Sequence, residues 1–153
     1  MSKSGLVSRV LPVTVIIAVR NEARNLPRCL AALSEVGEVI VVDSQSTDKT
    51  CAIAESFGAR VVQFRYNGGW PKKRQWVLDT LPLAYQWILL LDADEVVTRD
   101  LSHEIRQAIE SQSFDGYRIR LQMHFLGKPL RHCDASFWKL SLIRKGRARF
   151  ECR

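Results

Sequence analysis

The sequence of 153 residues contains no long apolar run. A membrane-spanning helix needs about 20 consecutive apolar residues, and the apolar stretches here are the length of single β-strands. The first residues also lack the apolar core and cleavage site of a signal peptide. A cytoplasmic location is therefore expected.

Cysteine is scarce as well. The four cysteines, Cys29, Cys51, Cys133 and Cys152, are scattered, and no two have the C-x-x-C spacing of a zinc or redox motif. We therefore expect reduced thiols and no zinc site. With 46% hydrophobic and 25% charged residues, no internal repeat and no low-complexity segment, the chain has the composition of one globular domain.

Acidic residues are nearly absent from the last quarter of the chain. Residues 116–153 contain 10 Lys and Arg against 2 acids, a charge of +8, whereas residues 1–115 contain 13 against 14, a charge of −1. This imbalance predicts contact with lipid headgroups, phosphorylated saccharide or nucleic acid, and a solvated basic face is the alternative. A peripheral contact with the anionic inner face of the cell membrane is accordingly expected.

Short runs of aliphatic residues are plentiful, and most are followed by polar residues. Val13–Val19, Glu38–Val42, Arg60–Arg65 and Ile88–Leu91 are typical of strands buried on both faces of a parallel sheet. Segments with helical spacing separate them, and another, Leu101–Ser111, follows. This order predicts an α/β fold with a mostly parallel, twisted sheet flanked by helices.

Polar clusters follow three of these strands, at Val19–Glu22, Asp43–Asp48 and Asp92–Glu95. Right-handed crossovers place the loops after parallel strands at one edge of the sheet, so we expect the clusters to converge there.

From Tyr117 the period of the apolar residues changes to two. The apolar residues of Tyr117–Phe125 and Trp138–Leu142 alternate with polar and basic ones, which predicts half-buried strands with a wet, basic face.

The segment Trp87–Val97, W-I-L-L-L-D-A-D-E-V-V, carries three acids after its strand. If the chain stays extended, Asp92 and Asp94 point the same way, with Cα atoms about 6.6 Å apart. We therefore expect one carboxylate to bind a metal such as Mg²⁺ and the other to bind a sugar hydroxyl or a metal-bound water. The alternative is that these acids only solvate a loop or cap the next helix.

Three motifs carry a resemblance to a known family. V-x-V-I-I-A-V-R-N-E, then V-I-V-V-D-S-x-S-T-D-x-T, then L-L-L-D-A-D-E resemble the family 2 glycosyltransferases of GT-A fold, and the likeness runs from Val13 to Glu151. The later segment, from Phe125-Leu126-Gly127 through W-K-L-S-L-I-R-K-G-R-A-R-F-E, is similar to the lipopolysaccharide inner-core β-glucosyltransferase subgroup.

The resemblance implies a Rossmann-like nucleotide-binding fold with a β-rich C-terminal segment. It also implies metal-assisted inverting transfer of a sugar from a nucleotide sugar, a UDP-sugar above all, to a saccharide or lipid-linked acceptor such as lipopolysaccharide core. Residues 1–12 would be an N-terminal tail and 13–153 the glycosyltransferase domain. Within it, 13–98 would bind the nucleotide sugar and 99–153 would begin the acceptor side.

The resemblance also implies roles for individual residues. Asp94 would hold Mg²⁺ or Mn²⁺, and Asp92 would contact the ribose or a metal-bound water, which makes these two the catalytic pair. Asp43 would accept from a ring N–H of the base, and Arg74 would reach the base or diphosphate, with Lys72 or Lys73 as substitutes. The nucleotide pocket would comprise Ala18, Val19, Arg20, Asn21, Glu22, Asp43, Arg74, Asp92 and Ala93.

Two departures from the family pattern bear on catalysis. Gln45 stands where the family usually has Gly or Asp. Family members also run well past residue 153, and their general base lies downstream, so the chain is expected to be the N-terminal, truncated part of such a protein. Asp134 and Glu151 are the only acids after Gly116, and neither matches the family's motif for the base.

Three other functions fit parts of the sequence. A nucleotide-sugar-binding module without turnover would explain the missing general base. A nucleotidyltransferase would also pair an α/β sheet with carboxylates and Mg²⁺, but it needs a Gly-rich loop after its first strand, and Arg20-Asn21-Glu22 has no glycine. A nucleic-acid-binding module would use the basic tail, but its strand aromatics are predicted to face inward and offer no stacking platform.

Overall fold

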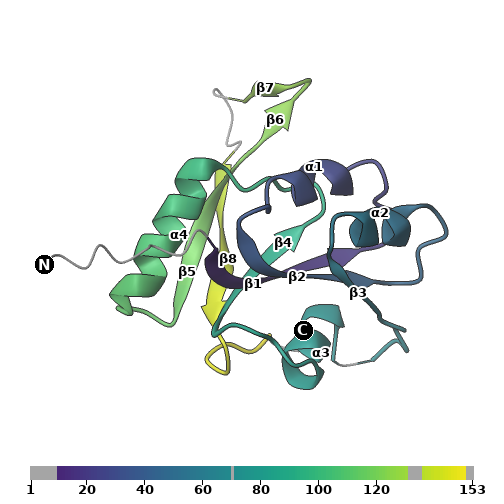
Figure 1. Cartoon of the computed structure of the whole chain (residues 1–153), viewed down its shortest axis with the longest axis horizontal. Coiled ribbons are helices and arrows are strands. Elements are labelled where there is room, and N and C mark those ends of the chain that lie inside the picture. Colours follow the sequence, from purple (N-terminus) through teal and green to yellow (C-terminus); the bar gives the residue numbers. More distant parts are fainter. Residues whose placement is uncertain (1–9, 70, 131–135, 151–153) are drawn as a thin grey trace, which may run out of the picture.

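The computed structural model describes residues 10–69, 71–130 and 136–150. Its main feature is a six-stranded sheet with the order β3-β2-β1-β4-β8-β5 (Figure 1). The first four of these strands are parallel, and β8 runs antiparallel to both of its neighbours, β4 and β5. The strands are β1 (Leu11–Val19), β2 (Val36–Asp43), β3 (Arg60–Gln63), β4 (Trp87–Asp92), β5 (Gly116–Gln122) and β8 (Ser136–Arg144). The predicted mostly parallel sheet flanked by helices is confirmed.

Helices cover both faces of the sheet. They are α1 (Leu26–Ala31), α2 (Thr50–Ser56), α3 (Lys73–Thr80) and α4 (Arg99–Ser111). Helices α1, α2 and α4 pack on one apolar core, and α3 packs on the other (Figure 1). No helix in the described ranges has the length and apolar character to cross a membrane.

The central strands divide their side chains between the two cores. In β1, Val15 and Ile17 belong to the core under α1, whereas Ile16 belongs to the core over α3. In β4, Leu89 belongs to the core under α1, and Leu90 belongs to the core over α3. Because both faces are buried, these strands have no polar face, and their sequences are nearly continuous apolar runs.

Local signals set the boundaries of helices α1 and α4. Helix α1 follows the N-cap residue Asn25, with Pro27 in its first turn, where proline costs no hydrogen bond. Helix α4 begins at Arg99, two residues before the predicted start. The reason is that the Thr98 side chain accepts a hydrogen bond from the Leu101 N–H at 3.1 Å and caps the helix there.

The β-rich segment differs from the prediction in which side chains face solvent. We expected Trp138, Leu140 and Leu142 to share one inward face, with Lys139 outside. Instead, Trp138 and Leu140 are 58% and 51% exposed, and the Lys139 side chain is only 18% exposed. Leu142 is buried as predicted. The interpretation of Trp138 and Leu140 as core residues was therefore wrong.

A β-bulge in β8 causes this reversal. Tyr117 is level with Leu142, but the next residue of β5, Arg118, is level with Leu140, so Ser141 is the extra residue. One extra residue moves every side chain beyond it to the opposite face of the strand. Leu142 and Lys139 consequently lie on the same face of the sheet, the face covered by α4. In a strand without a bulge, their spacing of three residues would put them on opposite faces.

The predicted alternating strand over Tyr117–Phe125 is also wrong at its end. Strand β5 stops at Gln122, and a separate hairpin follows, formed by β6 (His124–Phe125) and β7 (Lys128–Pro129). Met123 and Phe125 are 50% and 65% exposed, so they do not continue the core. In Figure 1 this hairpin projects beyond the sheet, at the top of the view.

Candidate active site

The loops after β1 and β2 are joined at the carboxyl edge of the sheet. The Asn21 N–H donates to Ser46 Oγ at 2.8 Å, and Asn21 Oδ1 accepts from the Thr47 N–H at 2.8 Å. Asn21 has a φ of 55°, a left-handed conformation that asparagine tolerates better than most residues. The loop after β4 lies at the same edge, because Ala18 of β1 is level with Asp92. The predicted convergence of the three polar clusters is confirmed.

The backbone after Asn21 is held by the neighbouring loop. The Glu22 N–H donates to Thr50 Oγ1 at 2.9 Å, and the Ala23 N–H donates to Asp48 Oδ2 at 3.2 Å. The Glu22 side chain in turn accepts from Asn25 Nδ2 at 2.9 Å. Side chains of the protein therefore accept the hydrogen bonds of these two N–H groups. A ligand bound at this edge would have to use other donors.

Asp43, the last residue of β2, is fully buried and accepts three hydrogen bonds. The Ser46 N–H and Gln63 Nε2 donate to Oδ2 at 2.9 and 3.0 Å, and Ser46 Oγ donates to Oδ1. Burial by itself raises the pKa of Asp43, but the hydrogen bonds from Ser46 and Gln63 outweigh burial and lower that pKa. The Cys51 thiol adds a further hydrogen bond that lowers the same pKa, so groups of the protein surround the Asp43 carboxylate, which has about four lone-pair sites in all.

The first turn of α3 sends two cations to the same edge. Lys73 Nζ donates to the carbonyl oxygen of Val19 at 2.7 Å, and Arg74 forms an ion pair with Asp92. Burial lowers the pKa of Lys73, although the Asp43 charge acts in the opposite direction. Lys72 is exposed. The two half-buried cations, Lys73 and Arg74, reach the ends of β1 and β4.

Lys139 is the residue at this edge that sequence reasoning missed. Its Nζ lies 2.7 Å from Asp92 Oδ2 and 2.7 Å from Glu95 Oε1. Glu95 Oε2 also accepts the backbone N–H of Asp92 at 2.9 Å. Lys139 therefore holds two of the three acids of the D-A-D-E motif in place. The side chain of Lys139 faces this edge because of the bulge in β8. The alternation of polar and apolar residues in the sequence does not reveal that bulge.

The geometry of Asp92 and Asp94 differs from the prediction. Strand β4 ends at Asp92, and Ala93 and Asp94 form a turn closed by a hydrogen bond from the Glu95 N–H to the Asp92 carbonyl at 3.0 Å. The condition of an extended chain is therefore not met, and the expected parallel alignment of the two carboxylates was wrong. Asp94 is exposed, and within the described residues its carboxylate accepts no hydrogen bond.

The remaining predicted nucleotide residues lie around this edge. Ala18 and Val19 end β1, and exposed Arg20 begins the following loop. Ala93 is buried next to Asp92. The structure thus brings all the predicted residues to one edge of the sheet.

The carboxylates that the structure describes at this edge do not by themselves form a complete site for a divalent cation. Within the described ranges, no group of three or more His, Cys, Asp and Glu side chains could hold a metal ion. Arg74 and Lys139 occupy the Asp92 oxygens, whereas the Asp94 carboxylate has no hydrogen-bond or ion-pair partner among the residues that the structure describes. Mg²⁺ usually binds through one or two carboxylates together with waters and substrate phosphates. Asp94 fits an ion that arrives with a diphosphate, and the site is not a metal cage built from protein alone.

Cys29 lies beneath the same edge but is unsuited to nucleophilic chemistry. Its Sγ lies 3.8 Å from the Asp92 carbonyl oxygen. Burial and the nearby Glu95 and Asp94 charges raise the pKa of the Cys29 thiol to about 12. A thiol with such a pKa stays protonated near neutral pH, and the thiolate is the nucleophilic form.

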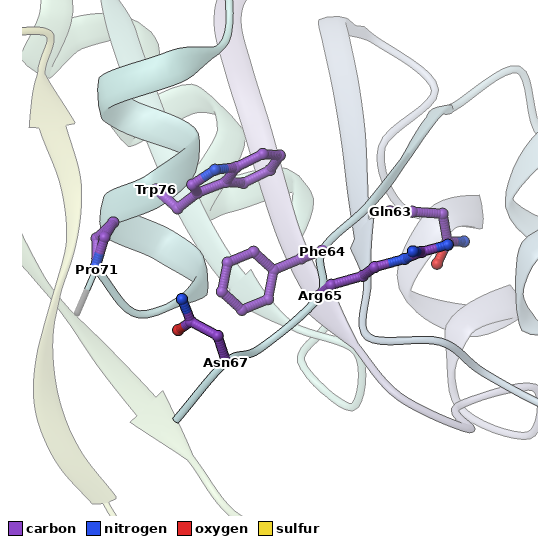
Figure 2. A pocket seen from close by; sticks show the side chains of 6 residues that line it. All are labelled: Gln63, Phe64, Arg65, Asn67, Pro71 and Trp76. Atoms are coloured by element: carbon purple, nitrogen blue, oxygen red, sulfur yellow. The ribbon is translucent and has the colours of Figure 1, made fainter. Parts of the chain in front are cut away.

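A cavity of about 360 Å³ opens between the end of β3 and the start of α3. Its lining residues are Gln63, Phe64, Arg65, Asn67, Pro71 and Trp76. Figure 2 shows the Phe64 and Trp76 rings beside one another, with Gln63 extending from the other side; the ring centroids are 5.3 Å apart. Gln63 connects this cavity to Asp43 through their hydrogen bond. The volume lies within the usual range for small-molecule sites, about 300–1,000 Å³.

Polar loops and basic side chains at the carboxyl edge of a mostly parallel sheet are typical of α/β proteins that bind nucleotides. Comparison with known proteins agrees with the class of nucleotide-binding α/β proteins and identifies a family within it. Residues 14–149 match the model of the family described as "Glycosyl transferase family 2". The chain belongs to this family.

Two relatives illustrate the match. An uncharacterized glycosyltransferase of Rickettsia bellii is 40% identical over 106 residues, covering 69% of this chain and 35% of that protein. The lipopolysaccharide core biosynthesis glycosyltransferase LpsC of Rhizobium meliloti is 26% identical over 147 residues, covering 92% of this chain and 54% of that protein. The chain therefore spans only part of the length of these relatives.

Solved structures agree with the fold. The structure of Staphylococcus aureus TarS residues 1–349 in complex with UDP has a TM-score of 0.58 to this chain and 25% sequence identity. The match covers 68% of this chain and 33% of that one. The GT-A fold implied by the sequence motifs is therefore confirmed.

Proposed function

We propose that the chain binds a UDP-sugar at the carboxyl edge of its sheet and takes part in transferring the sugar to a saccharide or lipid-linked acceptor, such as lipopolysaccharide core. The reaction proposed is a metal-assisted inverting displacement. The observation that carries this proposal is the convergence of three polar loops, with Lys73 and Arg74, beside one free carboxylate, Asp94. The UDP complex of TarS and the name of LpsC support it.

The proposed nucleotide site is the edge formed by the ends of β1, β2 and β4. The cavity beside Gln63 adds apolar surface next to it. Arg74 would turn part of its guanidinium towards the diphosphate, and Asp92 would contact the ribose while Lys139 keeps its second oxygen in place. The residues proposed to line this site are Ala18, Val19, Arg20, Asn21, Glu22, Asp43, Arg74, Asp92 and Ala93.

Asp94 would hold the Mg²⁺ or Mn²⁺ of the donor complex. A divalent ion at the diphosphate screens its negative charge and stabilises it as the leaving group. Arg28, whose guanidinium lies 3.4 Å from the Asp94 carbonyl oxygen, helps to hold the turn that presents this carboxylate. The chain's own contribution is thus to orient one carboxylate at the edge where the donor is proposed to bind.

A nucleotide-sugar-binding module without turnover is the second candidate. The observation that favours it is the lack of any acid among the described residues after Gly116, because deprotonating an acceptor hydroxyl needs a general base. Asp134 and Glu151 lie outside the described residues. A base beyond residue 153 stays a prediction.

The proposal predicts metal-dependent binding of uridine nucleotides. In calorimetric titrations, UDP and a UDP-sugar should bind at least tenfold more tightly with 5 mM Mg²⁺ than with chelator, a difference of about 1.4 kcal/mol. ADP in the same buffer is the control for non-specific binding of phosphate by the basic chain. Equal affinity for ADP and UDP, or no binding of either, would contradict the proposal.

Asp43 should contribute both to stability and to base preference. Asp43→Asn removes the negative charge and replaces one carboxylate oxygen by an NH2 group, which cannot accept, so the hydrogen bonds from Ser46 and Gln63 are weakened or lost and the free energy of unfolding should fall by about 1–3 kcal/mol. The preference for UDP over CDP should also fall, because an acceptor-only carboxylate for the ring N–H of uracil becomes a neutral amide that can also donate to the ring nitrogen of cytosine. Urea denaturation and calorimetry measure the two effects.

Gln63→Leu provides the matched control for Asp43→Asn. It removes one of the same hydrogen bonds and leaves the Asp43 carboxylate in place. We expect a smaller loss of stability and an unchanged ratio of UDP to CDP affinity. If Asp43→Asn also leaves that ratio unchanged, Asp43 only anchors its loop.

A further inference from the structure

The tip of the β6–β7 hairpin carries two exposed apolar side chains. His124 is level with Pro129 and Phe125 with Lys128, so Leu126 and Gly127 form a two-residue turn. Leu126 is 87% exposed and Phe125 is 65% exposed, and both belong to the described part of the chain. Neither side chain is covered by the rest of this structure.

The turn itself gives no reason for a leucine. Leu126 and Gly127 have φ angles of 49° and 78°, the left-handed pair of a type I′ turn. Such turns strongly prefer Asn-Gly, because asparagine tolerates positive φ and solvent, whereas leucine is unfavourable in both respects. Leucine at this position is therefore unfavourable for the isolated domain.

Exposed cations lie in the hairpin and along β5, the strand that leads into it. Arg118 and Arg120 lie on the outer face of β5, next to Trp138 and Leu140 of β8, and Lys128 lies in β7. Arg118 donates to the Trp138 carbonyl oxygen at 3.3 Å and Arg120 to Ser136 Oγ at 3.1 Å. Within the described residues none of these three cations pairs with a carboxylate. The sequence has no acid in residues 116–130 or 136–150.

The hairpin leaves the sheet at the edge that carries the candidate site. Ile119 of β5 is level with Lys139, whose Nζ contacts Asp92, and Gln122 ends β5 three residues further on. An extended path from Gln122 to Leu126 covers about 13 Å, so the hairpin tip extends beyond this edge. A surface that contacts the tip would therefore face the donor edge of the sheet.

We propose that the hairpin surface, defined as Phe125, Leu126 and Lys128 with Arg118 and Arg120, docks on an anionic lipid bilayer. The apolar tip enters the boundary between headgroups and acyl chains, and the three cations contact acidic headgroups. Combining buried apolar area with attraction to anionic lipid is the ordinary physics of peripheral membrane binding. This inference adds to the proposed function by placing a lipid-linked acceptor at the donor edge.

The other basic residues of the C-terminal segment are less suited to this contact. Arg144 and Arg147 both face Asp115, at 3.3 and 3.7 Å, and the Arg144 guanidinium also lies over the Trp87 ring. Lys145 and Arg149 are exposed, but they lie beyond the opposite end of β8. These two residues therefore offer a matched control of equal charge.

The experiment is sedimentation with large vesicles of 3:1 phosphatidylcholine and phosphatidylglycerol at 50 mM salt. The wild-type chain should bind them, and it should bind pure phosphatidylcholine vesicles at least tenfold more weakly. Phe125→Thr/Leu126→Asn should reduce binding at least tenfold. This variant should keep its hairpin, because threonine suits a strand and asparagine suits the turn. Circular dichroism and a thermal melt check that it is folded.

Two charge variants separate the hairpin surface from net charge. Arg118→Gln/Arg120→Gln should lose at least tenfold in binding, whereas Lys145→Gln/Arg149→Gln, with the same change in net charge, should lose less than threefold. Equal losses in both would overturn the proposal. No wild-type binding, equal binding to neutral vesicles, or full binding by Phe125→Thr/Leu126→Asn would also overturn it.

The same variant also tests the alternative that the hairpin binds a second copy of the chain and not lipid. If sedimentation velocity shows a wild-type dimer that Phe125→Thr/Leu126→Asn converts to monomer, while vesicle binding is unchanged, the hairpin is an interface between copies of the chain. The lipid proposal is then wrong. UDP titration of the same variant separates this inference from the proposed function, because the hairpin contributes no residue to the donor site.

Discussion

Lys139→Met is expected to lower the free energy of unfolding by about 2–4 kcal/mol at pH 7. The Lys139 and Glu95 side chains are only 18% and 15% exposed, and Lys139 Nζ lies 2.7 Å from both Asp92 and Glu95. Removing the ammonium leaves the poorly exposed Glu95 carboxylate close to the half-exposed Asp92 carboxylate, and Arg74 remains as the ion-pair partner of Asp92. Removing one partner of such an ion pair lowers the free energy of unfolding by more than the intact pair adds to it, because the charge of the other partner is left uncompensated. Urea denaturation measures the loss.

The loss should depend on pH in a defined direction. Burial by itself raises the pKa of Asp92, but the hydrogen bond from Lys139 and the charges of Arg74 and Lys139 outweigh it and lower that pKa below its usual 3.8. A carboxyl of this kind stabilises the folded state above its unfolded-state pKa and loses that contribution as the pH falls through its folded-state pKa. The difference between wild type and Lys139→Met should therefore be full at pH 7 and should shrink below about pH 4.

Lys145→Met is the control for Lys139→Met. Lys145 lies in the turn after β8 and is exposed, so its loss should change the free energy of unfolding by less than about 0.5 kcal/mol. Lys139→Arg keeps the charge and should restore part of the stability. If the difference between wild type and Lys139→Met is the same at pH 3 as at pH 7, the ion pairs with Asp92 and Glu95 do not cause it.

The fold and the location of the site could be predicted because their signals are local and repeated. Continuous apolar runs such as Val13–Val19 and Ile88–Leu91 require burial on both faces, and only a covered parallel sheet provides it. Once the sheet is parallel, chain connectivity places every following loop at one edge. The convergence of Asn21, Ser46 and Asp92 follows from these two steps, without any knowledge of side-chain contacts.

The part that could not be predicted depends on single-residue irregularities. The bulge at Ser141 turns Lys139 towards the site and Trp138 away from the core, and nothing in the alternation marks it. The end of β4 is a second case. Glu95 accepts the Asp92 N–H and donates its own N–H to the Asp92 carbonyl, so the chain turns at once. Which acid stays free is decided by these tertiary contacts.

Asp94→Asn is expected to remove most of the metal dependence of donor binding. Asp94 is the acid of the D-A-D-E motif whose carboxylate no cation or N–H of the described chain occupies, so it is the one available to a divalent ion. An amide oxygen is a weaker, uncharged ligand for such an ion. We expect the affinity for UDP with Mg²⁺ to fall at least tenfold, about 1.4 kcal/mol, and to approach the value measured with chelator.

Calorimetry with 5 mM Mg²⁺ and with chelator, on wild type and variant, tests the role of Asp94. The free energy of unfolding should change by less than about 0.5 kcal/mol, because an exposed side chain without partners stabilises little. Asp100→Asn, also an exposed acid, in the first turn of α4, should keep the metal dependence of the wild type. If Asp94→Asn binds UDP as tightly as the wild type in Mg²⁺, the ion is held elsewhere. Retained affinity in Asp94→Asn together with a loss in Asp92→Asn would assign the ion to Asp92, which would then have to be released by Arg74 and Lys139.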